Sequence, residues 1–123
     1  MSNVDVVKRC LDAVTRQDAD TLRALSSEDI EIHPLRAMLE DTVYRGPDGV
    51  DDWIRDLRET WAEMQFDVHD IAEPEPDCVV AKVTLRNRGH ASDVPTEMPV
   101  ELHARLRDGL VAHARVVTPE STR

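Results

Sequence analysis

The apolar residues of the first 25 positions recur with the period of an α-helix. A first apolar stripe is formed by Val4, Val7, Leu11 and Val14. Ser2–Asn3 stands just before this stripe, and such residues cap helices because a side-chain oxygen accepts a hydrogen bond from a free backbone N–H. Asp18 can cap a second, shorter helix that carries Leu22 and Leu25. The pattern predicts a helical hairpin.

Within Glu28–Pro34, apolar and polar residues alternate over the four residues Ile30–His33. Ile30 and Ile32 are the apolar positions, and the alternation ends on His33. Pro34 stops the pattern, because proline has no N–H to donate to a neighbouring strand. The segment predicts a short strand that ends on a histidine, followed by an irregular connection.

The longest amphipathic segment begins at Pro47, which suits the first turn of a helix because that turn needs no N–H donor. Its apolar residues are spaced by four, three, four and three positions: Val50, Ile54, Leu57, Trp61 and Met64. This spacing predicts one long helix that ends near Met64.

From Gln65 onward the apolar period changes to two, which indicates strands. Four strands are predicted, near residues 66–69, 79–86, 98–107 and 110–117. Glu73–Asp77 is predicted as a turn, Asn87–Thr96 as a polar loop or wide hairpin, and Asp108–Gly109 as a hairpin turn. Helices followed by strands with one apolar face predict a single α+β domain over residues 1–123, with helices on one face of an antiparallel sheet.

The alternation also assigns side chains to the two faces of the sheet. The inner face is expected to carry Ala81, Val83, Leu85, Met98, Val100, Leu102, Ala104, Ala112, Ala114 and Val116. The outer face is expected to carry Asp67, His69, Lys82, Arg86, Glu101, His103, His113 and Arg115. A two-residue turn at Asp108–Gly109 would pair Leu106 with Val111. Because that register would turn His113 inward, we favour a longer turn that keeps the alanines inside.

Charge and composition limit the classes of partner. The net charge is −10 and no basic run is visible, so nucleic acid is not an expected partner. No apolar run reaches membrane-spanning length, and no basic segment precedes an apolar one as in a signal peptide. We therefore expect a cytoplasmic protein with no membrane partner. Without a secretory signal, Cys10 and Cys78 are expected to be reduced.

No metal or cofactor is expected. Two cysteines are too few for a zinc framework, and neither C-x-x-C nor H-E-x-x-H spacing is present. His69, His103 and His113 can meet on one sheet face as a metal site. The charges that alternate around them favour a solvated or dimer-facing surface instead.

Five landmarks follow one another along nearly the whole chain. They are the first apolar stripe, Gln17–Leu22, Glu28–Pro34, Tyr44–Val50 and Arg107–Val111. In this order the chain resembles the nuclear transport factor 2-like superfamily, and within it the small SnoaL-like proteins. The resemblance implies a cone, in which a strongly curved, mainly antiparallel sheet wraps around the long helix and leaves a pocket. It also implies a homodimer through the outer sheet face.

The resemblance implies that His33 points into this pocket as a catalytic base. In ketosteroid isomerases the residue before the corresponding proline is the general-base aspartate. An imidazole with a pKa of about 6.5 can take and return protons near neutrality. The alternative is a structural histidine that bonds a backbone carbonyl or water.

In ketosteroid isomerases two side chains donate hydrogen bonds to the oxyanion. The resemblance places Cys10 and Leu102 at these two positions, and neither Cys10 nor Leu102 is a strong hydrogen-bond donor. An oxyanion donor contributes about 3–4 kcal/mol, so steroid isomerisation by that mechanism is not expected. The Asp-Arg-Asp set of limonene-type epoxide hydrolases has no evident inward counterpart either. Cys10 is interpreted as a buried filler.

Six residues are candidates for substrate binding: Cys10, Leu102, Tyr44, Trp61, Asn87 and Arg36. Tyr44 precedes the long helix. Its hydroxyl can point toward a ligand in the pocket, and the alternative is that it points away from the pocket. The helical spacing of Trp61 favours a place in the hydrophobic core over a role as an aromatic surface that contacts the ligand. Arg36 and Asn87 lie near the expected open end, where they can hold a polar ligand group.

Because the superfamily includes isomerases, cyclases, epoxide hydrolases, dehydratases and non-catalytic binders, the fold does not fix the function. The favoured hypothesis is a cofactor-independent isomerase, cyclase or lyase that uses His33 on a small, mostly apolar molecule. The alternative is a non-catalytic protein that binds such a molecule, favoured by the absence of a second inward acid or donor. A third hypothesis is an assembly module.

Overall fold

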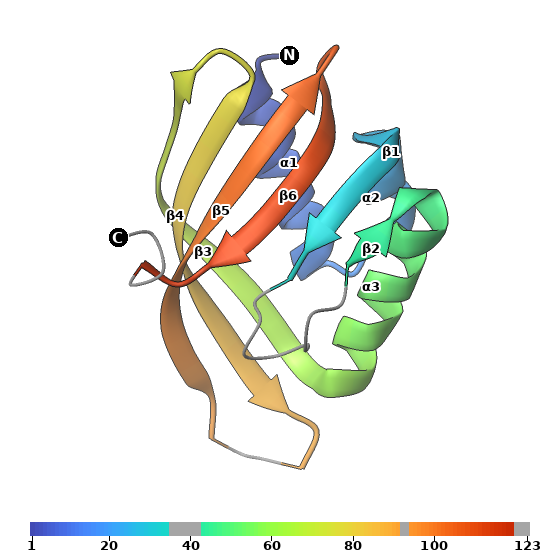
Figure 1. Cartoon of the computed structure of the whole chain (residues 1–123). Helices are drawn as coiled ribbons and strands as arrows, with labels where there is room; N and C mark the ends of the chain where they lie inside the picture. Colours follow the sequence, from blue (N-terminus) through green and yellow to red (C-terminus); the bar gives the residue numbers. More distant parts are fainter. Residues whose placement is uncertain (35–42, 92–93, 120–123) are drawn as a thin grey trace.

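The computed structural model describes residues 1–34, 43–91 and 94–119, and it confirms the α+β class. Figure 1 shows a curved sheet with the helices against one of its faces. The elements are α1 (Asn3–Thr15), α2 (Ala19–Ala24), β1 (Ser26–His33), β2 (Tyr44–Arg45), α3 (Gly46–Thr60), β3 (Trp61–Glu75), β4 (Cys78–Gly89), β5 (Thr96–Arg107) and β6 (Leu110–Val117).

The sheet has six strands in the order β2-β1-β6-β5-β4-β3. All neighbours are antiparallel except β1 and β6, which pair in parallel. The first strand therefore lies beside the last one, so Glu31 pairs with His113 and Ile32 with Ala114. The predicted curved, mainly antiparallel sheet is confirmed.

The predicted helical hairpin is confirmed, together with both of its caps. The Asp5 N–H donates to Ser2 Oγ at 3.1 Å, and the Ser2 N–H donates to Asp5 Oδ2 at 3.4 Å. The two residues thus cap α1 reciprocally. Asp18 Oδ1 accepts a 3.1 Å hydrogen bond from the Thr21 N–H at the start of α2.

The long helix is shorter than predicted, because α3 ends at Thr60 and β3 begins at Trp61. Trp61 and Met64 belong to the strand, yet both pack against the core. A register shift between Trp61 and Glu63 inserts one extra residue there. This bulge brings residues three apart onto one face of the strand, which imitates helical spacing.

The expected longer turn before the last strand is wrong. Asp108 and Gly109 form a two-residue turn with φ of 55° and 79°, as a tight hairpin turn requires. Leu106 pairs with Val111, but the preceding Arg105 pairs with His113. Ala112 is thus an extra bulge residue rather than an inner-face residue. The bulge keeps Ala114 and Val116 on the inner face and His113 on the outer face.

Other strand ends also differ from prediction. β3 continues to Glu75, into the predicted turn at Glu73–Asp77. The first strand begins at Ser26 rather than Ile30, with a register shift against β6 between Ser26 and Glu31. The predicted polar loop after β4 is shorter, because β4 continues to Gly89 and Asn87 still pairs with Thr96 of β5.

The core lies between the helices and the inner face of the sheet. Predicted inner-face residues of β4 and β5 are buried: Ala81, Val83, Leu85, Val100, Leu102 and Ala104. Val79 and Leu106 are buried beside them, and Met98 is partly buried against the core. Val6, Val7, Leu11 and Val14 of α1 and Val50, Ile54 and Leu57 of α3 cover them. Within the described residues, none of the helices has the length and apolar character needed to cross a membrane.

Candidate functional site

A small apolar cavity of about 40 Å³ lies between the helices and the sheet. Its lining comprises Val7, Cys10, Leu11, Val14, Leu22, Ser26, Ile30, Ile32, Trp53, Phe66, Val83, Val100, Leu102, Ala104, Val111, Ala114 and Val116. A water molecule needs about 10–15 Å³ of such space, whereas a pocket for a drug-sized ligand measures about 300–1,000 Å³. The cavity as it stands admits a few small atoms only.

Cys10 and Leu102, the two positions compared with oxyanion donors, both line this cavity. Burial raises the pKa of the Cys10 thiol to about 12. The thiol is therefore protonated near neutral pH, and a protonated thiol is a weak nucleophile. Both residues give the cavity an apolar wall and no charged group.

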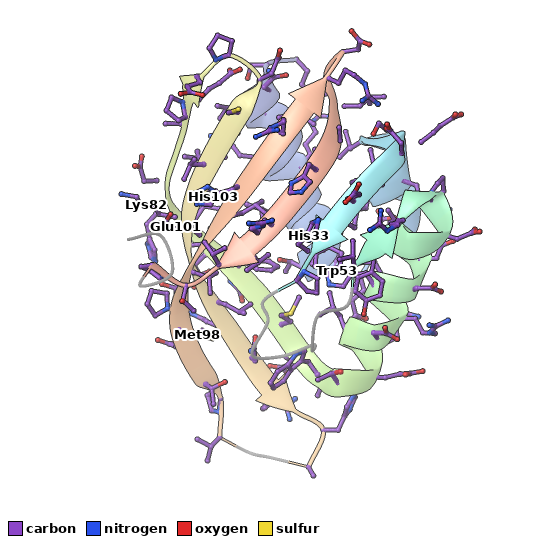
Figure 2. All side chains as sticks on the ribbon, viewed as in Figure 1. His33, Trp53, Lys82, Met98, Glu101 and His103 are labelled. Atoms are coloured by element: carbon purple, nitrogen blue, oxygen red, sulfur yellow. The ribbon has the colours of Figure 1, made fainter. Side chains whose placement is uncertain are left out.

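His33 does not line the cavity, and its expected position inside the pocket is wrong. Ile30 and Ile32 fill the inner face of β1, and the strand remains extended through His33. Side chains of neighbouring residues in a strand point to opposite faces. Because Ile32 points to the inner face, His33 points to the outer face. Figure 2 shows His33 at the end of β1, beside β6.

On the outer face His33 meets two partners. Its ring centroid lies 4.6 Å from that of His113, and its Nε2 atom lies 3.3 Å from Oε1 of Glu31. Glu31 Oε2 also lies 3.5 Å from Arg45 Nη1. Burial, followed by the nearby charges of His33 and Arg115, lowers the pKa of His113. Two imidazoles and one carboxylate are thus gathered at the β1–β6 pair.

Sequence reasoning missed this group of three residues as a unit. Glu31 and His33 are two apart in a strand, which places them on one face. The contribution of His113 depends on the parallel pairing of β1 with β6 and on the bulge at Ala112. The only local signal of this group in the sequence was the strand segment Glu31–His33, in which a glutamate and a histidine are two residues apart.

The hydroxyl of Tyr44 is hydrogen-bonded to another residue of the protein. It donates a 2.6 Å hydrogen bond to Oδ2 of Asp56 on α3, and the Tyr44 ring is buried. Burial and the neighbouring Asp56 carboxylate raise the pKa of Tyr44. This contact anchors β2 to α3, and Tyr44 is not among the residues that line the cavity.

Three buried polar atoms have no hydrogen-bond partner among the described residues: Asn87 Oδ1, Trp61 Nε1 and Trp53 Nε1. Asn87 is 5% exposed and continues the inner face of β4. Trp61 starts the neighbouring strand β3, and Trp53 projects from α3 and lines the cavity (Figure 2). Arg36, the remaining candidate, lies outside the described residues.

A family model described as a SnoaL-like domain matches residues 7–114. No curated protein matches the sequence. Many solved structures share the fold. A protein from Burkholderia pseudomallei described as nuclear transport factor 2-like and of unknown function is 19% identical, with a TM-score of 0.84 over 99% of this chain and 95% of that chain.

Two other similar structures carry enzyme names. A putative SnoaL-like polyketide cyclase from Jannaschia is 19% identical, with a TM-score of 0.80 over 98% of this chain and 87% of that chain. The putative polyketide cyclase IdmH from Streptomyces antibioticus is 20% identical, with a TM-score of 0.79 over 99% and 95% of the two chains. At these identities the likeness extends to the fold alone.

Proposed function

The chain belongs to the SnoaL-like domain family, and we propose that it binds a small, mostly apolar molecule between its helices and the inner face of its sheet. The observation that carries this proposal is the cavity lining, in which apolar side chains converge from α1, α3 and the strands. Burying apolar ligand surface there contributes about 25 cal/mol per Å². The proposed binding needs neither a cofactor nor a metal.

A ligand of more than a few atoms requires the cavity to widen beyond its 40 Å³. The unpartnered atoms of Asn87 and Trp61 support ligand entry at the end of the sheet where β3 begins and β4 ends, and Trp53 Nε1 is a further unpartnered donor in a residue that lines the cavity. A buried polar atom without a partner costs about 1–3 kcal/mol, and a ligand that supplies the missing hydrogen bond recovers this cost. The proposed ligand is therefore apolar, with one polar end.

The test compares two matched leucine substitutions in β6. Ala114→Leu fills the cavity, because Ala114 lines it, whereas Ala112→Leu changes the adjacent bulge, which does not line it. The probe is an apolar fluorescent dye such as anilinonaphthalene sulfonate, titrated into each purified protein. We expect Ala114→Leu to weaken dye binding at least tenfold and Ala112→Leu to leave it within twofold.

Native mass spectrometry of gently purified protein provides an independent measurement. A copurified small molecule that is lost in Ala114→Leu and retained in Ala112→Leu supports binding in the cavity. Dye binding that is equally strong in the two variants contradicts the proposal. Circular dichroism shows whether both variants keep the fold.

A proton-transfer enzyme, such as an isomerase, cyclase or lyase, is the second candidate function. Its support is the Glu31 carboxylate 3.3 Å from His33 Nε2, since a carboxylate can orient an imidazole that acts as a base. The substrate would then reach His33 at the outer face. His33→Ala should abolish turnover of a polyketide-like or terpenoid substrate, and His103→Ala should not. Turnover that survives in His33→Ala would exclude this candidate.

We further propose a cytoplasmic homodimer that uses the outer sheet face over β3, β4 and β5 and leaves the β1–β6 part of that face open. The support is its paired charges: Arg86 Nε lies 2.6 Å from Asp67 Oδ2 and 3.5 Å from Glu97 Oε1, and Lys82 stands opposite Glu101. Lys82, Glu101 and His103 are neighbours on β4 and β5 (Figure 2). A monomeric mass in light scattering at the working concentration would argue against this assembly.

A further inference from the structure

We propose that Glu31, His33 and His113 form a binding site for a divalent transition-metal ion, such as Zn²⁺, on the outer face of the sheet. One ligand atom from each of the three side chains lies within 4.8 Å of the other two. Two imidazoles and one carboxylate are a donor set that Zn²⁺, Co²⁺ and Ni²⁺ accept in proteins. This site is separate from the apolar cavity and does not depend on the proposed ligand.

The backbone brings the three donors together on two hydrogen-bonded strands. Glu31 and His33 project from the same face of β1, and His113 of β6 stands in register with Glu31. Donors on paired strands are held more firmly than donors on loops, so little order has to be created when the ion binds. The rings of His33 and His113 already lie against each other, with centroids 4.6 Å apart.

The distances suit a small ion. Two ligand atoms that each lie about 2.0–2.1 Å from a tetrahedral zinc are about 3.3–3.4 Å from each other. Glu31 Oε1 and His33 Nε2 are 3.3 Å apart, which is already this separation. His113 completes the set by a modest side-chain rotation, since no separation among the three ligand atoms exceeds 4.8 Å.

The ion can reach these donors from solvent. The side chains of His33 and Glu31 are 25% and 38% exposed. His113 and Arg115 also line an outer-face hollow of about 610 Å³. Three protein donors leave a fourth tetrahedral position, which water or a small anion fills.

Neighbouring arginines oppose the ion and set the expected strength of the site. Arg45 Nη1 lies 3.5 Å from Glu31 Oε2, and Arg105 and Arg115 pair with His113 and His33 in the sheet. Their positive charges weaken cation binding, although an anion at the open position would offset them. We expect a site weaker than a structural zinc site and sensitive to chloride or carboxylate in the buffer.

The test titrates Zn²⁺ into the tag-free, metal-stripped full chain by calorimetry, and Co²⁺ by its visible absorption. His103 supplies the matched control: its Nε2 lies 3.0 Å from Glu101 Oε1, a comparable histidine–glutamate pair on the same sheet. We expect one ion per chain, at least tenfold weaker binding in His33→Ala, His113→Ala and Glu31→Gln, and binding within twofold of the parent in His103→Ala.

The Co²⁺ spectrum separates this site from a chance surface contact, because tetrahedral coordination intensifies its visible bands and histidine nitrogen donors shift them. Bands that disappear in His113→Ala and persist in His103→Ala support the site. Absence of saturable binding in the parent chain, or equal binding in the parent and His113→Ala, overturns the proposal. Glu31→Gln keeps the shape of the side chain, so it also serves if an alanine variant fails to fold.

Discussion

The hydroxyl of Tyr44 donates a 2.6 Å hydrogen bond to Oδ2 of Asp56, and this bond joins the short edge strand β2 to the middle of α3. A hydrogen bond to a charged group contributes about 1.5–3 kcal/mol, less where water competes. Because the Asp56 side chain is 31% exposed, we expect Tyr44→Phe to lower the free energy of unfolding by about 1 kcal/mol. Urea denaturation measures the change. An unchanged midpoint would show that the bond contributes nothing net.

Gly49 is predicted to allow the close packing at the same junction. A Cβ at this position would lie 2.8 Å from the carbonyl carbon of Tyr44, which is closer than side chains tolerate. Overpacking of this kind costs about 1–3 kcal/mol, so Gly49→Ala should reduce the free energy of unfolding by that amount. Gly89 is the control, since a Cβ there meets no atom within 4 Å. Equal denaturation midpoints for Gly49→Ala and Gly89→Ala would contradict this packing.

The stability of the protein should fall at alkaline pH through Cys10. Burial raises the pKa of this thiol from 9.0 to about 12, so the unfolded chain loses its proton first as the pH rises. The stabilisation is fully present below pH 9.0 and is lost as the pH approaches about 12. The expected slope is at most about 1.4 kcal/mol per pH unit.

Denaturant titrations of the parent and of Cys10→Ala at several pH values measure this slope. The variant loses some stability at every pH, because the missing sulfur leaves a gap in the core. Between pH 9 and pH 12, however, the difference between the two proteins should shrink. A constant difference would mean that Cys10 is not the responsible group.

The orientation of β1 can be tested by adjacent substitutions. Ile32 is 2% exposed and faces the core, so Ile32→Ala should cost about 2–5 kcal/mol. His33 faces outward, so His33→Ala should change the free energy of unfolding by only about 0.5 kcal/mol. Thermal or urea unfolding distinguishes the two. A large loss in His33→Ala would indicate that its side chain is buried instead.

The helices and the inner face of the sheet could be predicted because local patterns determine them. Ser2 and Asp18 cap their helices through neighbours three residues away, and burial of Val83 or Val100 follows from strict alternation. The ends of elements were harder to place. The bulge after Trp61 imitates helical spacing, and only the pairing with β4 reveals it.

The position of His33 shows how a resemblance can override a local rule. Ile30 and Ile32 are apolar inner-face residues, so alternation alone places His33 on the outer face. The analogy with ketosteroid isomerases placed it inside, and the structure follows the alternation. The neighbour that His33 meets there, His113, could not be inferred, because it depends on a long-range parallel pairing and a bulge.

The parallel pairing of β1 with β6 also limits the order in which the protein can fold. Among the strands that the structure describes, β1 pairs with β2 and β6, and its partner residues 111–115 on β6 lie about 80 positions later in the chain. During synthesis β1 therefore cannot pair with β6 until β6 has left the ribosome. Until then the apolar side chains of Ile30 and Ile32 are not covered by the complete core. Such distant pairing slows folding and prolongs exposure to aggregation. A nascent chain arrested before residue 110 should therefore depend strongly on chaperones.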